Sequence, residues 1–532
     1  MTPRLLLPAP RLRASATRLL ASTTRLLAST MRRLAPTAFV VLPALAQAQP
    51  SMLVGDGARA QRARDATLEL DVIGARAILD GADPADPVVA VERGRLALYE
   101  GDCDSAAAIL SRSDLAATTV GAELGDIARG CARATAATLI VRDEERGVVV
   151  RLQDDEDRAM VPLMAEVADR ARALLTKDLG VTLPRPIFID LVRDQFTLSA
   201  MTGLPLQAAQ TTGTVAVAKW GRVTMISPRA TQNGYPWLDT LVHELTHLAL
   251  TQATRDKAPL WLQEGVAKRE ETRWRDREPF DDLPSSDAVA VIGLERGLGR
   301  PIDKLGPSIA MLPSPEQAQV AFAEVSSFIR FYARDAGDAA LPRLLLQIKS
   351  MDRPDDMDAA LKAVSGFSFT EWDKRWRAYL ATVPRNIPPD LAPGAPVLNL
   401  SEVSKRVRLG ELLLDRGHPR AAVIQHTRAQ ILAPHEPVLR CMLASAMLAS
   451  SDRPGALPLV EKTTDVHSRY GRWWSLHGLL HPALAGSPSP FRFGIALDPL
   501  NPAVACEEKP APDLPEDAVH AALCAAARRV PR

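Results

Sequence analysis

Little in this 532-residue sequence points to a nucleic acid or to a membrane as its partner. The net charge is only +1, with 64 Lys and Arg against 63 Asp and Glu, so the composition lacks the basic excess that nucleic-acid binding requires. No apolar run reaches 18 residues, and we therefore expect no integral membrane span. Aromatic residues make up only 5% while proline reaches 42 residues, which argues against a large β-sandwich and favours helices interrupted by prolines. At roughly 150 residues per domain, the length favours three or four domains.

Cysteine is also scarce, with five residues whose spacings match no metal-binding motif. Two pairs are close enough in sequence to form bridges, Cys103 with Cys131 and Cys506 with Cys524. We expect the remaining Cys441 to be a buried core thiol. Bridges would be compatible with a protein that is exported from the cytoplasm.

Residues 1–48 contain no acidic side chain and have the pattern of a signal or targeting segment. Arg32 and Arg33 precede a short apolar stretch, and the small residues at 44–48 form an Ala-x-Ala cleavage site, which together are typical of a secretory signal. Cleavage after Ala46 and cleavage after Ala48 fit equally well. We therefore expect a periplasmic or secreted protein. A transit peptide is the alternative, because the segment is also rich in Arg and Ser.

Helical segments are predicted on both sides of the central part of the chain. Apolar residues at three- and four-residue steps predict short helical hairpins over 55–140, which faintly resemble tetratricopeptide repeats. A Pro-rich linker is expected at 383–400. A 35-residue period over 401–485 again resembles tetratricopeptide repeats. The Pro-rich tail at 486–532 is left unassigned.

The central segment, 145–382, is expected to combine strands with helices. Apolar runs at 148–150 and 187–192 predict buried strands, with an amphipathic helix between them. Two alternating runs within 214–226 are joined by Gly221-Arg222 and predict a β-hairpin. From 236 to about 380 the pattern is helical.

One motif carries a clear chemical signal, the H-E-x-x-H sequence at 243–247. Four residues is about one helical turn, so His243 and His247 project from one face of a helix and can bind a single Zn²⁺. Glu244 then points toward the metal-bound water, where a carboxylate acts as general base. The alternative is a core helix with two incidental histidines. That alternative is weak because none of the other seven histidines occurs before His418.

The third metal ligand must be a carboxylate. A catalytic zinc has three protein ligands and one open position. Between residues 132 and 417 the sequence holds no Cys and no further His. Asp256, Glu264, Glu270 and Glu271 are the candidates that follow the motif.

Glu264 lies in a W-L-x-E-G-x-A segment at 261–267, and this segment together with the H-E-x-x-H motif resembles the gluzincin metallopeptidases. That group includes aminopeptidases and the smaller peptidase MA-like proteins. The resemblance covers about 145–382 and implies that His243, His247 and Glu264 bind zinc and that Glu244 is catalytic. It implies Zn²⁺ as the cofactor and a peptide or protein as the substrate.

The expected fold class is α+β and mostly helical. The resemblance implies a zincin-like catalytic domain, in which a small mixed sheet is combined with an active-site helix and a helical lobe. The α-helical repeat-like segments described above would flank this domain on both sides.

The sequence departs from the gluzincin pattern in three places. The aminopeptidase signature G-x-M-E-N is absent, so recognition of a free amino terminus is not implied. The acid expected four residues after the third ligand is Lys268, which leaves open what orients His243. No further His is present to stabilise an oxyanion, for which Tyr235 and Tyr332 are the candidates.

The sequence thus predicts an exported zinc metallopeptidase that hydrolyses peptide bonds through a zinc-activated water, with Glu244 as general base. A first alternative is a scaffold whose tetratricopeptide-like helices bind a protein partner and whose zincin fold has little or no activity. The intact Glu244 argues against it, because a structural zinc has no use for a general base. A second alternative is a zinc hydrolase of another substrate, since the metal chemistry would be the same.

Overall fold

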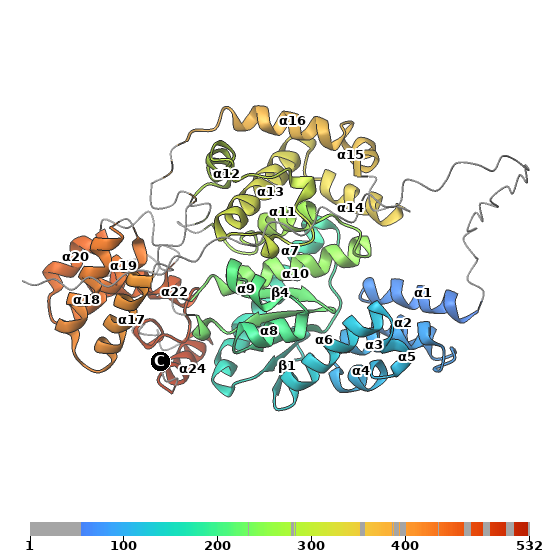
Figure 1. Cartoon of the computed structure of the whole chain (residues 1–532), viewed down its shortest axis with the longest axis horizontal. Helices are drawn as coiled ribbons and strands as arrows, with labels where there is room; N and C mark the ends of the chain where they lie inside the picture. Colours follow the sequence, from blue (N-terminus) through green and yellow to red (C-terminus); the bar gives the residue numbers. More distant parts are fainter. Residues whose placement is uncertain are drawn as a thin grey trace, which may run out of the picture. The chain divides into compact units, whose positions relative to one another are not determined.

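The computed structural model describes residues 55–529, apart from short internal gaps at 232–233, 278–280, 282–283, 352–356, 386, 388–392, 394–400, 435, 462–469, 482–489 and 507–514. The predicted export segment at 1–48 and most of the predicted linker at 383–400 therefore lie outside the described residues. Figure 1 shows the elements in chain order, from the blue N-terminal helices to the red C-terminal ones. Within the described part of the chain, no helix is both long and apolar enough to cross a membrane.

A five-stranded mixed sheet lies in the central segment, with strand order β1-β2-β3-β5-β4. Strands β2, β3 and β5 run parallel, while β1 and β4 pair antiparallel at the two edges. The α+β, mostly helical fold class predicted from the sequence is confirmed. The strand bounds are β1 Leu139–Asp143, β2 Val148–Leu152, β3 Ile187–Val192, β4 Ala216–Lys219 and β5 Arg222–Ile226.

The β4–β5 hairpin differs in one detail from the prediction. The two turn residues are Trp220 and Gly221, with φ angles of 56° and 69°, and Arg222 already belongs to β5. A two-residue turn with two positive φ angles matches the right-handed twist of the strands that it joins. Strand β1 was not predicted, because it is an edge strand whose Ile140 is exposed and it lacks the apolar run of a buried strand.

Within the described residues, six helices precede the sheet, as the apolar periodicity over 55–140 predicts. Helix α3 is typical, because Asp86 caps its first turn, Pro87 is its first residue and Gly101 ends it with φ 80°. The predicted bridge between Cys103 and Cys131 is present. The bounds are α1 Asp56–Leu68, α2 Val72–Leu79, α3 Pro87–Glu100, α4 Cys103–Leu110, α5 Ser113–Ala116 and α6 Thr119–Thr135.

Helix α10, Trp237–Thr254, is the central helix of the fold. It contacts β4 and β5 as well as the neighbouring helices α7, α11 and α14 (Figure 1). Its sequence contains no Pro or Gly, and Leu241, Val242 and Leu245 on its packed face are fully buried. Burial of each such side chain stabilises the fold by about 1.5–3 kcal/mol, so the position of α10 is strongly determined.

Further helices and short 3-10 segments complete the central part of the chain. Two short 3-10 segments, η1 Asp155–Met160 and η2 Pro228–Ala230, adjoin the sheet, and η3 Ile302–Lys304 and η4 Ile309–Met311 precede α13. The helix bounds are α7 Val161–Leu179, α8 Gln195–Thr202, α9 Leu206–Thr212, α11 Leu260–Glu270, α12 Ser286–Glu295, α13 Pro315–Ala336, α14 Ala340–Ser350, α15 Met357–Ser365 and α16 Phe369–Leu380.

Helices also follow the predicted linker. The second predicted bridge, Cys506 to Cys524, is present, and Cys441 is a buried free thiol as expected. The Trp237 indole at the start of α10 donates a hydrogen bond to the carbonyl of Ile495, which connects this region to the site-bearing helix. The domain boundaries and the tetratricopeptide character of the flanks remain predictions. The bounds are α17 Ser401–Asp415, α18 Pro419–Leu432, α19 Pro437–Ala449, α20 Arg453–Glu461, α21 Gly471–Leu480, α22 Pro490–Ile495, α23 Pro502–Ala505 and α24 Pro515–Ala527.

Helices α11 and α13 pack tightly against each other at Gly265. A Cβ atom placed there would lie 2.3 Å from Cγ1 of Ile329 and 2.7 Å from the carbonyl oxygen of Val325. The second contact is with backbone, which cannot rotate away. The glycine next to Glu264 therefore permits the close packing of α11 against α13.

We predict that Gly265→Ala lowers the free energy of unfolding by about 1–3 kcal/mol, because α11 must move away from α13. Denaturant unfolding of the full chain measures this change. The matched control is Gly125→Ala in helix α6, where the nearest atom to the added Cβ would be the flexible end of Arg129 at 3.2 Å, and the Leu110 carbonyl oxygen and Cβ would lie at 3.5 and 3.8 Å. That control should be neutral or slightly stabilising. Equal stability of both variants would contradict the packing argument.

Candidate metal centre

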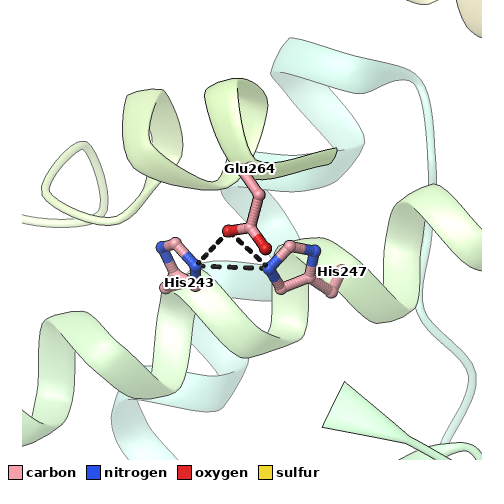
Figure 2. A group of neighbouring side chains, drawn as sticks. All are labelled: His243, His247 and Glu264. Atoms are coloured by element: carbon pink, nitrogen blue, oxygen red, sulfur yellow. Dashed lines mark hydrogen bonds and ion pairs between the residues drawn. The ribbon is translucent and has the colours of Figure 1, made fainter. Parts of the chain in front are cut away.

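Two helices bring three potential metal ligands to one point. Helix α10 carries His243 and His247 one turn apart, and helix α11, which begins after Pro259, carries Glu264. Figure 2 shows the two rings and the carboxylate pointing toward one another. Among the described residues, this is the group of His, Cys, Asp and Glu whose donor atoms lie close enough together to hold a metal ion.

The distances within this group suit a tetrahedral zinc ion. The two Nε2 atoms lie 3.2 Å apart, and Glu264 Oε2 lies 3.5 Å from His243 Nε2 and 3.6 Å from His247 Nε2. Ligands bonded to zinc at about 2.0–2.1 Å in a tetrahedron are separated by about 3.3–3.4 Å. Two imidazoles and one carboxylate also leave one coordination position open. The three side chains therefore fit a catalytic type of zinc site.

Glu271 orients the first histidine. Its Oε2 lies 3.0 Å from His243 Nδ1, the ring nitrogen on the side away from Glu264, and its Oε1 accepts a hydrogen bond from Lys268 Nζ at 2.6 Å. A carboxylate at this nitrogen fixes the ring orientation and makes the opposite nitrogen a better ligand. Lys268, which occupies the position where an acid was expected, instead holds the acid that performs this task.

Glu271 was considered from the sequence only as a competitor for the third ligand. The signal that would have identified its position is its spacing, because it follows Glu264 by seven residues, or two helical turns. Two residues at that spacing lie on the same face of a helix.

Glu244 lies in the same buried region and is only 7% exposed. Its Oε2 accepts a hydrogen bond of 2.6 Å from the backbone N–H of Ala218 in the edge strand β4. This contact joins the sheet to α10 and fixes one carboxylate oxygen, while the other remains available for proton transfer. The role of the Ala218 N–H was not predicted from the sequence. Every residue except proline has a backbone N–H, so residue type does not indicate which one forms such a contact.

The other candidate residues lie elsewhere. Glu270 is fully buried and pairs with Arg269 and Arg273. Asp256 follows the end of α10 and is exposed. Neither belongs to the group of three potential ligands.

The two tyrosines considered for the oxyanion both have structural contacts. The buried Tyr235 hydroxyl donates to the carbonyl of Ile226. The Tyr332 ring packs against Trp372, with 5.0 Å between the centroids, in the helical lobe.

The carboxylates of the centre differ in the direction in which their surroundings shift the pKa. Burial alone would raise the pKa of Glu264, but the His247 and His243 imidazoles outweigh it and hold that pKa well below its usual value. The pKa of Glu271 falls to about 2, because Lys268 and His243 likewise outweigh the effect of burial. For Glu244, burial dominates over the two imidazoles, so its pKa is raised above the usual value. A base with a raised pKa binds a proton more readily, as proton transfer near neutral pH requires.

The pKa of His243 is determined by its carboxylate neighbours more than by burial. Burial lowers its pKa, but hydrogen bonds to Glu264 and Glu271 and the charges of the nearby carboxylates raise it to about 10. Without a competing metal, the imidazole is therefore protonated at neutral pH. A metal ion that binds at Nε2 must displace this proton.

We predict that chelator-treated protein loses stability as the pH rises from about 7 to 10. The folded pKa of His243, about 10, lies above its ordinary value of 6.5, so its stabilising contribution is complete below 6.5 and is lost as the pH rises through 10. The loss should exceed about 1 kcal/mol relative to His243→Asn measured over the same range. Urea unfolding in the presence of EDTA measures it. Parallel pH profiles for the two proteins would refute the assignment.

Comparisons with known proteins give a match for one part of the chain. Among curated proteins, no sequence matches. A family model described as the Peptidase MA superfamily matches residues 167–382. The matched segment includes strands β3 to β5, the helices α10 and α11 with all four predicted site residues, and the helical lobe to α16. The match supports a zincin-like peptidase superfamily for this segment and a peptidase-like enzyme for the protein.

Proposed function

We propose that this protein is an exported zinc-dependent metallopeptidase of the gluzincin type that hydrolyses peptide bonds. The observation that carries the proposal is the convergence of His243, His247 and Glu264 beside a Glu244 held by the edge strand. The peptidase superfamily match over the same segment supports it.

The proposed ligands are His243, His247 and Glu264, with zinc as the metal. Their separations of 3.2–3.6 Å suit tetrahedral zinc, and their single carboxylate balances one of its two charges. When bound, zinc would polarise the scissile carbonyl and lower the pKa of a water molecule. Glu271 would act through His243 by holding its ring in position.

Glu244 is proposed as the general base. Its Oε2 is held by Ala218, so the carboxylate has a defined orientation and Oε1 can accept a proton from water. Because burial raises its pKa, the protonated side chain can then donate that proton to the leaving amine.

The position of β4 supports a peptide as the substrate. This strand forms an edge of the sheet, pairs on one side with β5 and touches Glu244 through Ala218. The unpaired backbone groups at a sheet edge can bind an extended peptide as an additional strand. A substrate bound along β4 would pass beside the centre.

Export is supported by the two disulfides, since such bridges persist mainly outside the cytoplasm. We propose a periplasmic or secreted location, in agreement with the signal-like pattern of residues 1–48.

We predict about one zinc ion per chain, with loss of zinc in His243→Ala, His247→Ala and Glu264→Ala because each removes a ligand. Glu271→Gln should retain the site but weaken its zinc affinity by about 10–100-fold, as removal of a ligand-orienting partner usually does. Elemental analysis and competition with a chelator measure both quantities. Asp256→Asn is the matched control, because this nearby acid lies outside the cluster, and its zinc content should equal that of wild type. Full zinc occupancy after removal of both histidines would contradict the site.

We predict that Glu244→Gln lowers peptide hydrolysis by a factor of about 10²–10⁴ while zinc content and melting temperature stay close to wild type. The amide oxygen of Gln can still accept the Ala218 hydrogen bond, but the amide cannot act as a base. Hydrolysis of casein and of a peptide mixture is the measurement. Unchanged hydrolysis would remove Glu244 from the mechanism. A zinc-loaded wild type that cleaves no peptide would favour the scaffold alternative.

A further inference from the structure

The hairpin formed by α17 and α18 exposes a concentration of apolar side chains. Among the described residues, 14 large apolar side chains are exposed, and five of them lie on these two helices. Their exposed fractions lie between 43% and 72%, and they are Leu409, Leu412, Ile424, Ile431 and Leu432. Apolar residues scattered singly over a surface are normal, whereas a group of them marks a surface that contacts something other than water.

Helical spacing separates these side chains from the packed side of the hairpin. In α17 the exposed Leu412 lies two residues after the buried Gly410. In α18 the exposed Ile424 lies two residues before the buried His426. Positions two residues apart on an α-helix are about 200° apart around its axis. Leu412 and Ile424 therefore lie on the outer faces of their helices.

The exposed side chains of the two helices meet on one side of the hairpin. Helix α17 packs against α18 (Figure 1), and Arg406 Nη1 donates a hydrogen bond of 3.2 Å to Gln425 Oε1. Leu409 follows Arg406 by three residues, and Arg428 follows Gln425 by three residues. Residues at this spacing are neighbours on a helix, so both lie near the bonded pair. We call the exposed side chains of α17, α18 and the turn 416–418 the α17–α18 surface.

Basic side chains are interspersed with the apolar ones. Arg416 follows Leu412 by four residues, and Arg420 and Arg428 lie four residues before and after Ile424. Residues four apart are neighbours on one helix face. The described residues supply no ion pair and no side-chain hydrogen bond to the exposed cations of this surface, which are Lys405, Arg408, Arg416, Arg420 and Arg428.

The carboxylates of the same two helices balance little of this charge. Glu402 and Glu411 each pair with an arginine that is not among these five cations, at 2.8 Å. Asp415 is the remaining acid of α17, and α18 contains none. The undescribed stretches that adjoin the hairpin, 394–400 and 435, contain no Asp or Glu either. The α17–α18 surface therefore carries a net positive charge.

This charge decides which occupant the surface fits. A second copy of the chain, seated on the same surface, would bring like charges together, which is unfavourable. The predicted export segment, 1–48, has no acidic side chain and cannot neutralise the cations. The occupant is therefore a separate partner that combines negative charge with apolar groups.

A lipid bilayer with anionic headgroups has both properties. A partner helix is usually received in a hydrophobic groove. Here the apolar side chains protrude from outer helix faces, and the exposed fraction of Ile431 reaches 72%. Protruding apolar side chains can insert between lipid headgroups, while nearby arginines bind the phosphates.

We propose that the α17–α18 surface docks on an anionic lipid bilayer. Its apolar side chains enter the headgroup region, and its five cations lie against the lipid phosphates. The proposal goes beyond the proposed function and does not depend on it, because none of these residues belongs to the candidate metal centre. Its failure would leave the proposed peptidase activity untouched.

The first test is co-sedimentation of the protein with phosphatidylcholine vesicles, prepared with and without phosphatidylglycerol. The protein should bind only the vesicles that contain phosphatidylglycerol, and binding should fall as salt is raised because the charges are screened. The full chain is compared with the form that lacks residues 1–48, because these residues are basic too. Absence of binding, equal binding to both kinds of vesicle, or binding that disappears with residues 1–48 would overturn the proposal.

The cations are tested by Arg416→Gln combined with Arg420→Gln. The affinity for phosphatidylglycerol vesicles should fall about 30-fold, because each basic residue near an anionic surface contributes about fivefold. The matched control is Arg62→Gln combined with Lys374→Gln, which removes two exposed cations from α1 and α16. Equal losses in the two double variants would attribute binding to net charge and contradict the proposed surface.

The apolar contact is tested by Leu412→Gln combined with Ile424→Gln, which leaves the charge unchanged. Vesicle binding should weaken while the melting temperature stays close to wild type, since both side chains are exposed. The matched control is Ile73→Gln combined with Leu346→Gln, at exposed positions of α2 and α14, and it should bind as wild type does. Wild-type binding by the Leu412 and Ile424 variant would refute insertion of this surface.

Two rival occupants give different outcomes. Sedimentation equilibrium that shows a dimer, broken by the Leu412 and Ile424 variant, would identify a second copy as the occupant. Binding of an acidic protein that the Arg416 and Arg420 variant abolishes, without any vesicle binding, would identify a protein partner. Either result would overturn the proposed docking on a bilayer.

Discussion

The candidate site depends on a hydrogen-bonded chain of alternating charge, from Lys268 through Glu271 and His243 to Glu264. Each of these groups would be costly to bury alone, because a charge loses its hydration when it is removed from water. In sequence they come from only two helices, and their mutual pairing offsets this cost when α10 and α11 pack together. The same packing sets the positions of the two imidazole nitrogens. The arrangement of these candidate ligands is therefore a consequence of helix packing, and the pairing of their charges lowers the cost of burying them.

Three carboxylates of this region illustrate how the surroundings determine chemical role. Glu264 and Glu271 lie against imidazole or ammonium groups, and their pKa values fall, so both remain anionic. Glu244 is equally enclosed, but burial outweighs the nearby imidazoles and its pKa rises. Two anionic groups thus suit binding and orientation, while the third suits proton transfer. This division supports the proposed roles independently of the motif.

The flanking helices are bonded to the elements that carry the site. The buried Arg222 at the start of β5 donates from Nη2 to the carbonyls of Leu98 and Tyr99, which belong to α3. At the other end of the chain, the Trp237 indole and the Tyr235 N–H donate to the carbonyls of Ile495 and Leu497. Both flanks therefore contact the β5 and α10 region, although the superfamily match covers neither of them.

The sequence by itself determined the local features of this protein. Helical periodicity located α10, and the four-residue spacing placed His243 and His247 on one face, because these relations depend on neighbours along the chain. The shortage of His and Cys reduced the third ligand to a carboxylate, and the segment around Glu264 favoured that residue by resemblance. Only the tertiary structure decided which carboxylate meets both imidazoles and which orients His243, since Glu264 and Glu271 occur on the same helical face. The contact between Ala218 and Glu244 could not be predicted either, because it arises from packing between elements that are distant in sequence, and residue type and spacing do not indicate such packing.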